Sequence, residues 1–317
     1  MITAWVLSGL GLVILLLAGD ALVKGAVNLS LRIGIPALIV SLTIVAFGTS
    51  APELLISIKA VLDGVPGLAL GNVVGSNTAN ILLVLGVPAL LATMHTSECN
   101  TRRSFNHMIA ATVLFIALAF RGVFDWIASL ALLAALAAML LDAARQARSH
   151  KHDDAPCAEE DLEGVDPDMP GWRIAFFLVL GLVGLPLGAS LLVDNATVIA
   201  KEFGVSDTVI GLTLVAIGTS LPELATTVMA ALRRQADVVL GSVIGSNMFN
   251  LLAIIGVAGL VGPITVDPEF LRFDLWVMLG ASLLLIPFVY LQKDINRLWG
   301  IALSALYATY LIVVLAG

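Results

Sequence analysis

Apolar residues form ten long runs along the chain, and polar residues gather in the segments between them. A helix needs about 20 predominantly apolar residues to cross a bilayer, and most of the runs approach or exceed that length. The fourth and ninth runs are short. The predicted spans cover residues 3–23, 36–60, 68–92, 106–121, 124–144, 172–197, 208–231, 238–262, 274–291 and 298–316. The pattern therefore predicts an all-α polytopic membrane protein with ten transmembrane helices.

Composition supports this fold class. The 317 residues are 59% hydrophobic and only 12% charged, with a mean hydropathy of +1.03. Soluble domains carry about twice that charged fraction. The net charge of −7 comes mostly from one polar segment, because eight of the 23 acidic residues lie between Asp153 and Asp168. This segment divides the chain into a first unit (1–145), an acidic linker (146–171) and a second unit (172–317).

The distribution of basic residues predicts the orientation. If the N-terminus lies outside, twelve of the 16 Lys and Arg residues fall in inside loops and four in outside loops. Basic residues favour the cytoplasmic side of a membrane. We therefore expect both termini outside and the 146–171 linker in the cytoplasm.

The two units repeat one another. GTSAPEL at 48–54 recurs as GTSLPEL at 218–224, with six of seven residues identical and an offset of 170. GNVVGSNTANILLVLG at 71–86 matches GSVIGSNMFNLLAIIG at 241–256 at eight of 16 positions, with the same offset. Five spans per unit is an odd number, so the second unit begins on the opposite side of the membrane. The sequence thus predicts two inverted five-helix repeats, an architecture that suits alternating access around a midplane site.

The GTS-x-PEL copies place oxygen atoms in the middle of apolar runs. Their hydroxyl and carboxyl side chains lie three and four residues apart and share one helix face. Proline inside each copy lacks an N–H, so a backbone carbonyl one turn earlier is also left without its helical donor. The residues on the shared face are Thr49, Ser50 and Glu53 in the first copy and Thr219, Ser220 and Glu223 in the second. Such an all-oxygen set suits hard cations such as Na⁺ and Ca²⁺.

A purely structural interpretation of the same residues is a capping box, because S-x-x-E with proline in the first turn is typical of a helix start. That interpretation places the motif at a water interface. Apolar residues continue on both sides of the first copy, with LIVSLTIVAF before it and LLISIKAVL after it. We therefore favour an ion site, and a helix start within the membrane could combine both roles.

The second pair of motifs adds further oxygen atoms. Within each copy a serine and an asparagine stand one turn apart, and a second asparagine, Asn77 or Asn247, adjoins them. The candidate ligands from these motifs are Ser76, Asn80, Ser246 and Asn250. Hydrogen bonding between helices is the alternative interpretation for these four. Paired glycines in the same motifs, Gly71 with Gly75 and Gly241 with Gly245, predict close helix packing.

Electrostatics sharpens the interpretation of the two glutamates. An acidic residue at a helix centre costs about 2.5–3.5 kcal/mol on insertion scales. Two carboxylates about 6 Å apart repel by roughly 3 kcal/mol at an effective dielectric constant near 20. Such a pair should hold a proton, Na⁺ ions or a divalent ion. Competition of different cations for this site is a physical route to antiport.

The remaining polar residues indicate less. Asp20 and Asp194 lie near the ends of predicted spans, where we expect interfacial or capping roles. No P-loop, dinucleotide fingerprint or nucleophile with a paired base is present, so the sequence predicts neither an enzyme nor a bound cofactor. The expected partners are the transported ions and the lipid bilayer, with no nucleic acid.

With these motifs in view, the chain resembles the sodium/calcium exchangers of the cation/calcium antiporter superfamily, most closely the bacterial inner-membrane members. GTSAPE with GSNTAN, and GTSLPE with GSNMFN, carry the resemblance. It implies a fold of two five-helix inverted repeats in which helices 2, 3, 7 and 8 surround the ions. It also implies Glu53 and Glu223 as central ligands, and it adds the backbone carbonyls of Ala46 and Ala216 to the hydroxyl and amide ligands named above.

The resemblance leaves the driving ion to be decided. Family members with an acid at the position of Asn250 include potassium-dependent ones, so asparagine here argues against a K⁺ requirement. The G-N-A-T-E motif of the proton-coupled branch is absent. Our leading hypothesis is an antiporter that exports Ca²⁺ in exchange for Na⁺. The alternatives are H⁺-coupled Ca²⁺ antiport and, from another class, a passive cation channel or a structural membrane scaffold.

Overall fold

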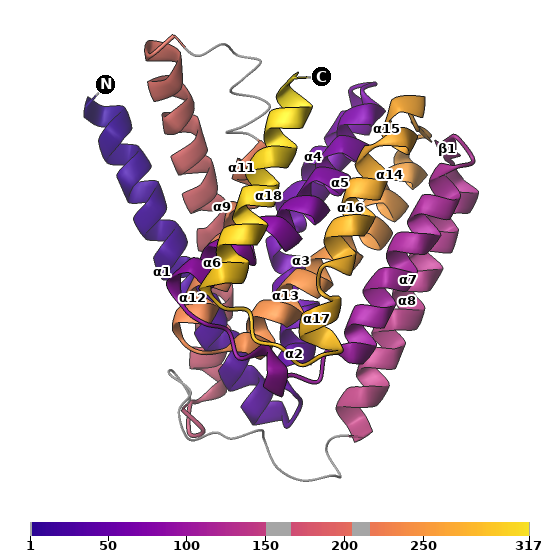
Figure 1. The fold of residues 1–317 in the computed structure, drawn as a ribbon. Helices are drawn as coiled ribbons and strands as arrows, with labels where there is room; N and C mark the ends of the chain where they lie inside the picture. Colours follow the sequence, from indigo (N-terminus) through magenta and orange to yellow (C-terminus); the bar gives the residue numbers. More distant parts are fainter. Residues whose placement is uncertain (1, 150–165, 205–215, 317) are drawn as a thin grey trace.

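A computed structural model describes residues 2–149, 166–204 and 216–316, and most of this part of the chain is helical (Figure 1). The first unit contains α1 (Ile2–Ile33), α2 (Ala37–Val40), η1 (Ser41–Val45), α3 (Ala46–Thr49), α4 (Ala51–Leu62), α5 (Pro66–Leu82), α6 (Gly86–Leu91), η2 (Thr96–Glu98), α7 (Arg102–Ala119), β1 (Val123–Phe124) and α8 (Trp126–Ser149). The second unit contains α9 (Gly171–Glu202), α11 (Ala216–Thr219), α12 (Leu221–Leu232), α13 (Ala236–Phe249), η5 (Asn250–Ile254), α14 (Ile255–Val261), β2 (Ile264–Thr265), α15 (Pro268–Arg272), α16 (Asp274–Leu283), α17 (Ile286–Val289) and α18 (Arg297–Ala316).

Seven of the ten predicted spans coincide with helices that are long and apolar enough to cross a membrane. The second predicted span is a helix pair, Ala37–Thr49 and Ala51–Leu62, bent by 44°. The seventh begins outside the described residues, and its described part includes the shorter apolar helix Leu221–Leu232. The fourth corresponds to α7, which begins with Arg102 and Arg103 and is not among the apolar spans.

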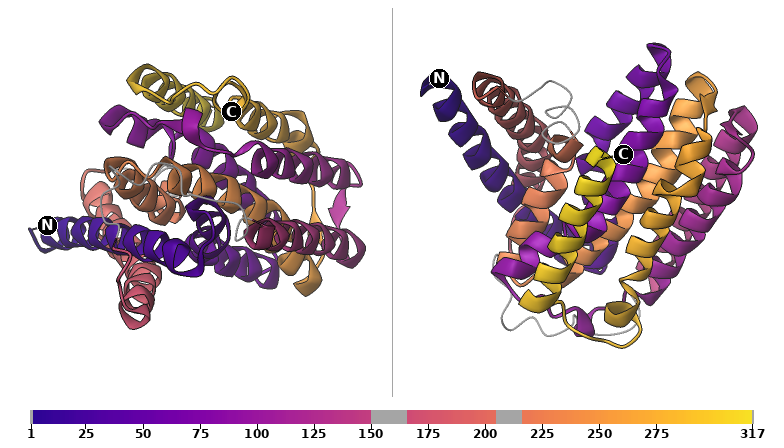
Figure 2. Two further views of the ribbon diagram at one scale, coloured as in Figure 1. Left: turned by 90° about the horizontal axis from the view of Figure 1, so that it is seen from below. Right: turned by 45° about the horizontal axis from the view of Figure 1, so that its top comes forward.

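Helices α1 and α9 form a pair that leans away from the rest of the bundle (Figure 1, Figure 2). Glycines allow their backbones to approach closely. A Cβ atom on Gly11 would lie 2.7 Å from the backbone nitrogen of Leu192, and one on Gly188 would lie 2.8 Å from that of Leu15. The pair makes its other contacts mainly with α12, α2 and the short segments around the GTS motifs.

The interior of the bundle is built around α5 and α13. In the apolar stretch of Ala236–Val261, which contains α13 and α14, 94% of the residues are buried. The share is 78% for Pro66–Leu91, which contains α5 and α6, but only 22% for α9. Gly241 and Gly245 bring α13 against α2, η1 and α3, as the sequence predicts: a Cβ atom on Gly241 would lie 2.6 Å from the carbonyl oxygen of Leu38. The same packing is expected of Gly71 and Gly75 against residues 207–219, which correspond to α2, η1 and α3 under the repeat. That segment lies mostly outside the described residues.

Two short backbone pairings join loops of the two units. Phe124 pairs with Ile264 in the antiparallel β1–β2 ladder, and Met94 forms an isolated bridge with Ile295. Ile264 lies 170 positions after Met94, and Ile295 lies 171 positions after Phe124. The two pairings are therefore counterparts under the repeat, to within one residue.

The ends of the chain share one face of the molecule, and α8 ends and α9 begins at the opposite face (Figure 1). The acidic linker 146–171 falls largely outside the described residues. Both Asp20 and Asp194 lie well inside helices, because α1 continues to Ile33 and α9 to Glu202. The expectation that they sit near helix ends is therefore wrong, and Asp20 instead accepts a hydrogen bond of 2.5 Å from Nε of Arg233.

Candidate functional site

Each GTS-x-PEL copy interrupts a helix at its serine. Ser50, with φ −84° and ψ 3°, separates α3 from α4, and Ser220, with φ −88° and ψ 3°, separates α11 from α12. Proline follows two residues later in each copy, at the start of the new helix, where its missing N–H is tolerated. Each copy is therefore divided between the end of one helix and the start of the next.

The capping-box interpretation is wrong in this structure. Neither Ser50 nor Ser220 makes a side-chain capping hydrogen bond to the helix that follows it. The hydroxyl of Ser50 instead donates to Oε1 of Glu223, 3.3 Å away in the other unit. Thr49 also interacts with the Glu223 carboxylate. The motif thus joins the two units at the residues for which the sequence predicts an ion site.

Glu53 and Glu223 are almost fully buried, with 1% and 2% of their surfaces exposed. They lie close enough to interact electrostatically. Oxygen Oε2 of each carboxylate is buried and, within the described residues, lacks a hydrogen-bond partner. A buried acceptor that lost its water and gained no partner costs about 1–3 kcal/mol, and more when it is charged. Two such oxygens require a cation, or a proton, to be stable.

The GSN motifs meet in a cluster of four asparagine side chains with two-fold symmetry. Asn80 donates through Nδ2 to Oδ1 of Asn247, and Asn250 donates in the same way to Oδ1 of Asn77, both at 3.0 Å. Asn77 and Asn247 also donate to each other's backbone carbonyls, at 3.1 and 3.4 Å. Every one of these contacts is matched by its counterpart 170 residues away. The cluster therefore fixes which way the side chains of Asn80 and Asn250 turn.

Once their NH₂ groups are held, Asn80 and Asn250 present carbonyl oxygens that have no donor. Oδ1 of each is buried without a partner, as are Oγ of Ser220 and Oγ of Ser246, within the described residues. Side chains from both units thus contribute unpartnered oxygens, two of them carboxylate oxygens. Among the described residues, no group of three or more His, Cys, Asp or Glu could hold a metal ion, so neutral oxygens would have to complete a cation site. Oxygen ligands of this kind suit Na⁺ and Ca²⁺.

The other predicted ligands have more varied surroundings. Ser76 is buried in α5, and Thr219 is half-buried at the end of α11. The carbonyl of Ala46 accepts hydrogen bonds from the backbone N–H of Ser50 at 3.1 Å and from the hydroxyl of Thr49 at 3.3 Å, so it is engaged within its own helix. Ala216 begins α11.

Sequence reasoning misses the supporting residues of the site. It places Asn77 and Asn247 beside the ligands, but their role in holding Asn80 and Asn250 depends on contacts between the units. Asn72 donates to the backbone carbonyl of Glu53 at 3.4 Å. The hydroxyl of Thr227 donates to the carbonyl of Glu223 at 2.9 Å. The signal that could have found the asparagine pair is the repeat itself, because Asn77 and Asn247 occupy the same position in both GSN motifs.

We expect Asn77→Leu to destabilise the protein without changing the number of carboxylates at the site. The substitution leaves the amide of Asn250 without its acceptor, which costs about 1–3 kcal/mol for a buried polar group. Thermal unfolding of the purified protein should show a lower midpoint. Asn195→Leu is the matched control, because Asn195 donates to Leu191 of its own helix. Equal midpoints for Asn77→Leu and the wild type would contradict the supporting role.

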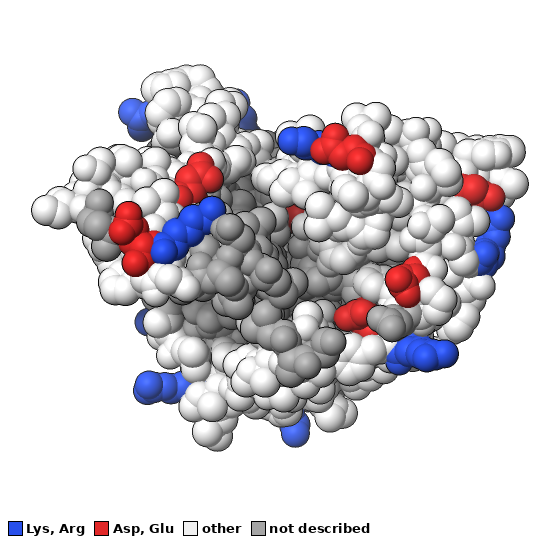
Figure 3. Space-filling model, turned by 90° about the horizontal axis from the view of Figure 1, so that it is seen from above, with Lys and Arg blue, Asp and Glu red and all other residues white. Residues whose placement is uncertain are grey.

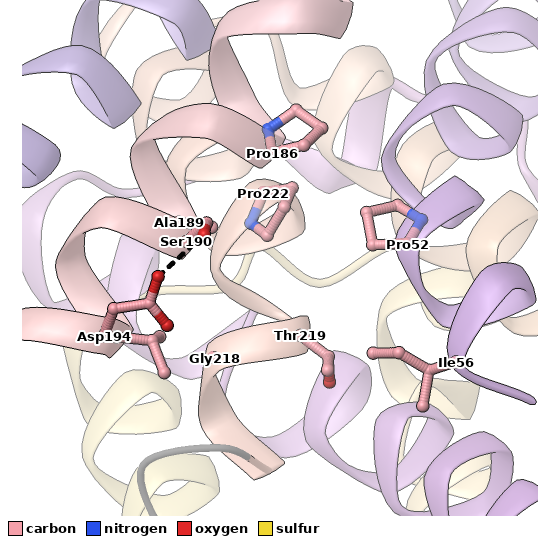
Figure 4. A pocket seen from close by; sticks show the side chains of 10 residues that line it. Pro52, Ile56, Pro186, Ala189, Ser190, Asp194, Gly218, Thr219 and Pro222 are labelled. Atoms are coloured by element: carbon pink, nitrogen blue, oxygen red, sulfur yellow. Dashed lines mark hydrogen bonds between the residues drawn. The ribbon is translucent and has the colours of Figure 1, made fainter. Parts of the chain in front are cut away.

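A cavity of about 210 Å³ adjoins the two motifs (Figure 4). Its wall includes Pro52 and Pro222, which immediately precede the two glutamates, and Thr219. The remaining lining residues are Ile56 of α4, Gly218 of α11, and Pro186, Ala189, Ser190, Val193 and Asp194 of α9.

Comparison with known proteins adds a family context to this geometry. The sequence pattern of the family described as "Sodium/calcium exchanger protein" matches residues 3–142 and 173–316. The chain is 38% identical to "Putative antiporter CaxA" of Alkalimonas amylolytica, over 98% of both chains. It is 34% identical to "Sodium/calcium exchanger MaX1" of Methanosarcina acetivorans, over 96% of both chains. It is also 34% identical to "Inner membrane protein YrbG" of Escherichia coli, over 90% of this chain and 88% of that one.

The fold is similar to a solved exchanger. The structure of the sodium-calcium exchanger NCX_Mj, soaked with Na⁺ and Sr²⁺, superposes with a TM-score of 0.82 at 30% sequence identity. The match covers 100% of this chain and 99% of that one.

Proposed function

Because the chain belongs to the sodium/calcium exchanger protein family, we propose that it exports Ca²⁺ in exchange for Na⁺ that enters down its gradient. The family consists of membrane antiporters, so the chain is a multi-pass membrane protein and not an enzyme. The observation that carries the proposal is the pair of buried carboxylates, Glu53 and Glu223, one from each repeated motif. Each has an oxygen that no protein group satisfies within the described residues.

Charge balance explains how one site can serve both ions. Two carboxylates give the site a charge of −2, which one Ca²⁺ or two Na⁺ can neutralise. The carbonyl oxygens of Asn80 and Asn250 and the hydroxyls of Ser220 and Ser246 add neutral ligands for either ion. Because the repulsion between the carboxylates makes the empty, doubly ionised site unfavourable, one cation leaves as another arrives. Thr49, Ser50, Thr219, Ser76 and the carbonyls of Ala46 and Ala216 complete the proposed ligand set.

We further propose that the ten helices form two inverted five-helix repeats. The reciprocal contacts of the four asparagines support this arrangement, since each contact has a counterpart 170 residues away. The Met94–Ile295 and Phe124–Ile264 pairings follow the same offset to within one residue. Alternating access would then arise when α1 and α9 slide as a pair across the remaining helices. Their extensive mutual packing, and the way the pair leans away from the other helices, support this motion (Figure 1).

The orientation with both termini outside and the 146–171 linker in the cytoplasm stays part of the proposal, as does a location in a bacterial inner membrane. The basic residues of the sequence support it, since twelve of 16 fall on the linker side. The two chain ends lie on one face of the molecule, as this topology requires (Figure 1).

A flux experiment with the purified protein in liposomes tests the driving ion. We expect ⁴⁵Ca²⁺ uptake when Na⁺ is loaded inside and absent outside, with pH clamped equal on both sides by buffer and ionophore. Uptake should persist when K⁺ is replaced by choline, because the site has two carboxylates and Asn250 in place of an acid. Uptake that follows a proton gradient and ignores Na⁺ would favour H⁺ coupling, and uptake with no counter-ion would favour a channel.

A further inference from the structure

Among the described residues, the wall of the cavity beside the two motifs contains one acidic side chain. Its wall is formed by α4, α9, α11 and the start of α12, and nearly all of its described lining residues are apolar or uncharged (Figure 4). Asp194 is the exception among them. The cavity therefore combines apolar walls with one fixed negative charge.

Asp194 stands at the exposed end of this cavity. It lies in α9, is exposed at the surface of the molecule, and accepts a hydrogen bond of 3.1 Å through Oδ2 from the hydroxyl of Ser190 (Figure 4). Ser190 lies one turn earlier on the same helix and is also exposed. The bond holds the carboxylate at the cavity wall.

The other end of the cavity reaches the proposed ion site. Thr219, which lines it, belongs to the second GTS motif. Pro52 and Pro222 also line it, and each is bonded directly to one of the two buried glutamates. The cavity thus leads from an exposed carboxylate to the residues that flank the site.

The acidic residue at position 194 has no acidic counterpart at the equivalent position of the first unit. Subtracting 170 places Lys24 at the position of Asp194 and Asp20 at that of Ser190. Nζ of Lys24 lies 4.8 Å from the ring centre of Phe177. Asp20 pairs with Arg233 at 2.5 Å. The position in α1 that corresponds to Asp194 therefore carries a cation, and its neighbouring acid is already neutralised by an arginine.

We propose that Asp194 recruits cations at the mouth of the ion path on the face that carries the chain ends, and so sets the apparent affinity for Ca²⁺ and Na⁺ from that face alone. The inference rests on the proposed exchange function. Charges in clefts with low-dielectric walls focus the electric field and raise the local concentration of counter-ions. On the same face, acidic side chains lie beside basic ones at several places (Figure 3), and Asp194 is the acidic side chain among the described residues that line the cavity. A divalent ion responds more strongly than a monovalent one because its charge is doubled.

Kinetics of Asp194→Asn in membrane vesicles of both orientations tests the proposal. From the face with the chain ends, we expect the KM for Ca²⁺ to rise by about 3- to 10-fold, at the low end of typical steering effects, with a smaller rise for Na⁺ and an unchanged maximal rate. From the opposite face, KM should equal that of the wild type. Raising the ionic strength with choline chloride should shrink the difference, because salt screens exposed charges. Asp194→Glu should restore the wild-type KM.

Asp63→Asn is the matched control. Asp63 is an exposed acid at the end of α4, outside the cavity wall, and its substitution should leave KM unchanged from either face. An unchanged KM for Asp194→Asn at low ionic strength would overturn the recruiting role. An equal rise from both faces, or the same rise in Asp63→Asn, would also overturn it. Absence of Na⁺-dependent Ca²⁺ flux in the wild type would instead reject the proposed function itself.

Discussion

Glu53→Gln and Glu223→Gln are each expected to lower Na⁺-dependent Ca²⁺ exchange by about 10- to 150-fold. Each substitution preserves the volume of the side chain but removes one of two negative charges that the transported ions must balance. A contact to a charged group is worth about 1.5–3 kcal/mol, and about 1.4 kcal/mol corresponds to a factor of ten. Loss of a ligand that touches both ions should therefore affect Ca²⁺ and Na⁺ together. Initial rates of ⁴⁵Ca²⁺ uptake into proteoliposomes measure the effect.

The control for both variants is Glu202→Gln, because Glu202 is exposed at the end of α9. It should exchange ions at the wild-type rate. All three variants should reach wild-type expression and elute as the wild type does in size-exclusion chromatography, since an amide in place of a buried carboxylate relieves repulsion between the two acids. Near-normal exchange in either Glu53→Gln or Glu223→Gln would contradict the role of that residue as an ion ligand.

Gly245→Val is expected to abolish transport by pushing α13 away from the first GTS motif. A Cβ atom on Gly245 would overlap the carbonyl oxygen of Leu42 and lie 2.6 Å from Cβ of Ala46. Overpacking of a well-packed interior typically costs about 1–3 kcal/mol, and here the nearest atom belongs to the backbone and cannot rotate away. Because Asn247 and Asn250 lie only two and five residues after Gly245, the shift would also misplace the asparagine cluster.

Thermal unfolding and ⁴⁵Ca²⁺ exchange of Gly245→Val, side by side, measure this effect. Gly9→Val is the matched control, because Gly9 is exposed on α1 and a Cβ atom added there would have no neighbouring atom within 4 Å. It should change the unfolding midpoint little and leave exchange intact. Wild-type exchange by Gly245→Val would show that close packing of α13 against α3 is not needed to shape the site.

The sequence predicts the apolar helices well because their signal is local. Runs of about 20 apolar residues need no knowledge of neighbours, and seven of the ten expected spans coincide with long apolar helices. Two of the three exceptions have local causes, and the third, the span 208–231, begins outside the described residues. Arg102 and Arg103 lower the apolar character of α7, and Ser50 with Pro52 breaks the second span into a bent pair.

The details of the site depend on contacts between units that no local pattern contains. The S-x-x-E spacing is compatible with Ser50 capping its own helix, yet its hydroxyl donates to Glu223 of the other unit. Asn77 is visibly polar and repeated in the sequence, but its role as the acceptor for Asn250 requires α5 and α13 to lie side by side. Contrary to the sequence prediction, Asp194 does not lie near a helix end, because α9 continues to Glu202, beyond the predicted span 172–197.

Anomalous diffraction from crystals grown with Sr²⁺, a heavier analogue of Ca²⁺, tests the central claim most directly. We predict one strong anomalous peak within reach of a carboxylate oxygen of both Glu53 and Glu223, at about the 2.3–2.6 Å of calcium–oxygen contacts or slightly longer for the larger ion. The peak should disappear when Na⁺ is raised. A peak that contacts neither glutamate, or one that Na⁺ leaves unchanged, would contradict a shared site at which the two cations compete.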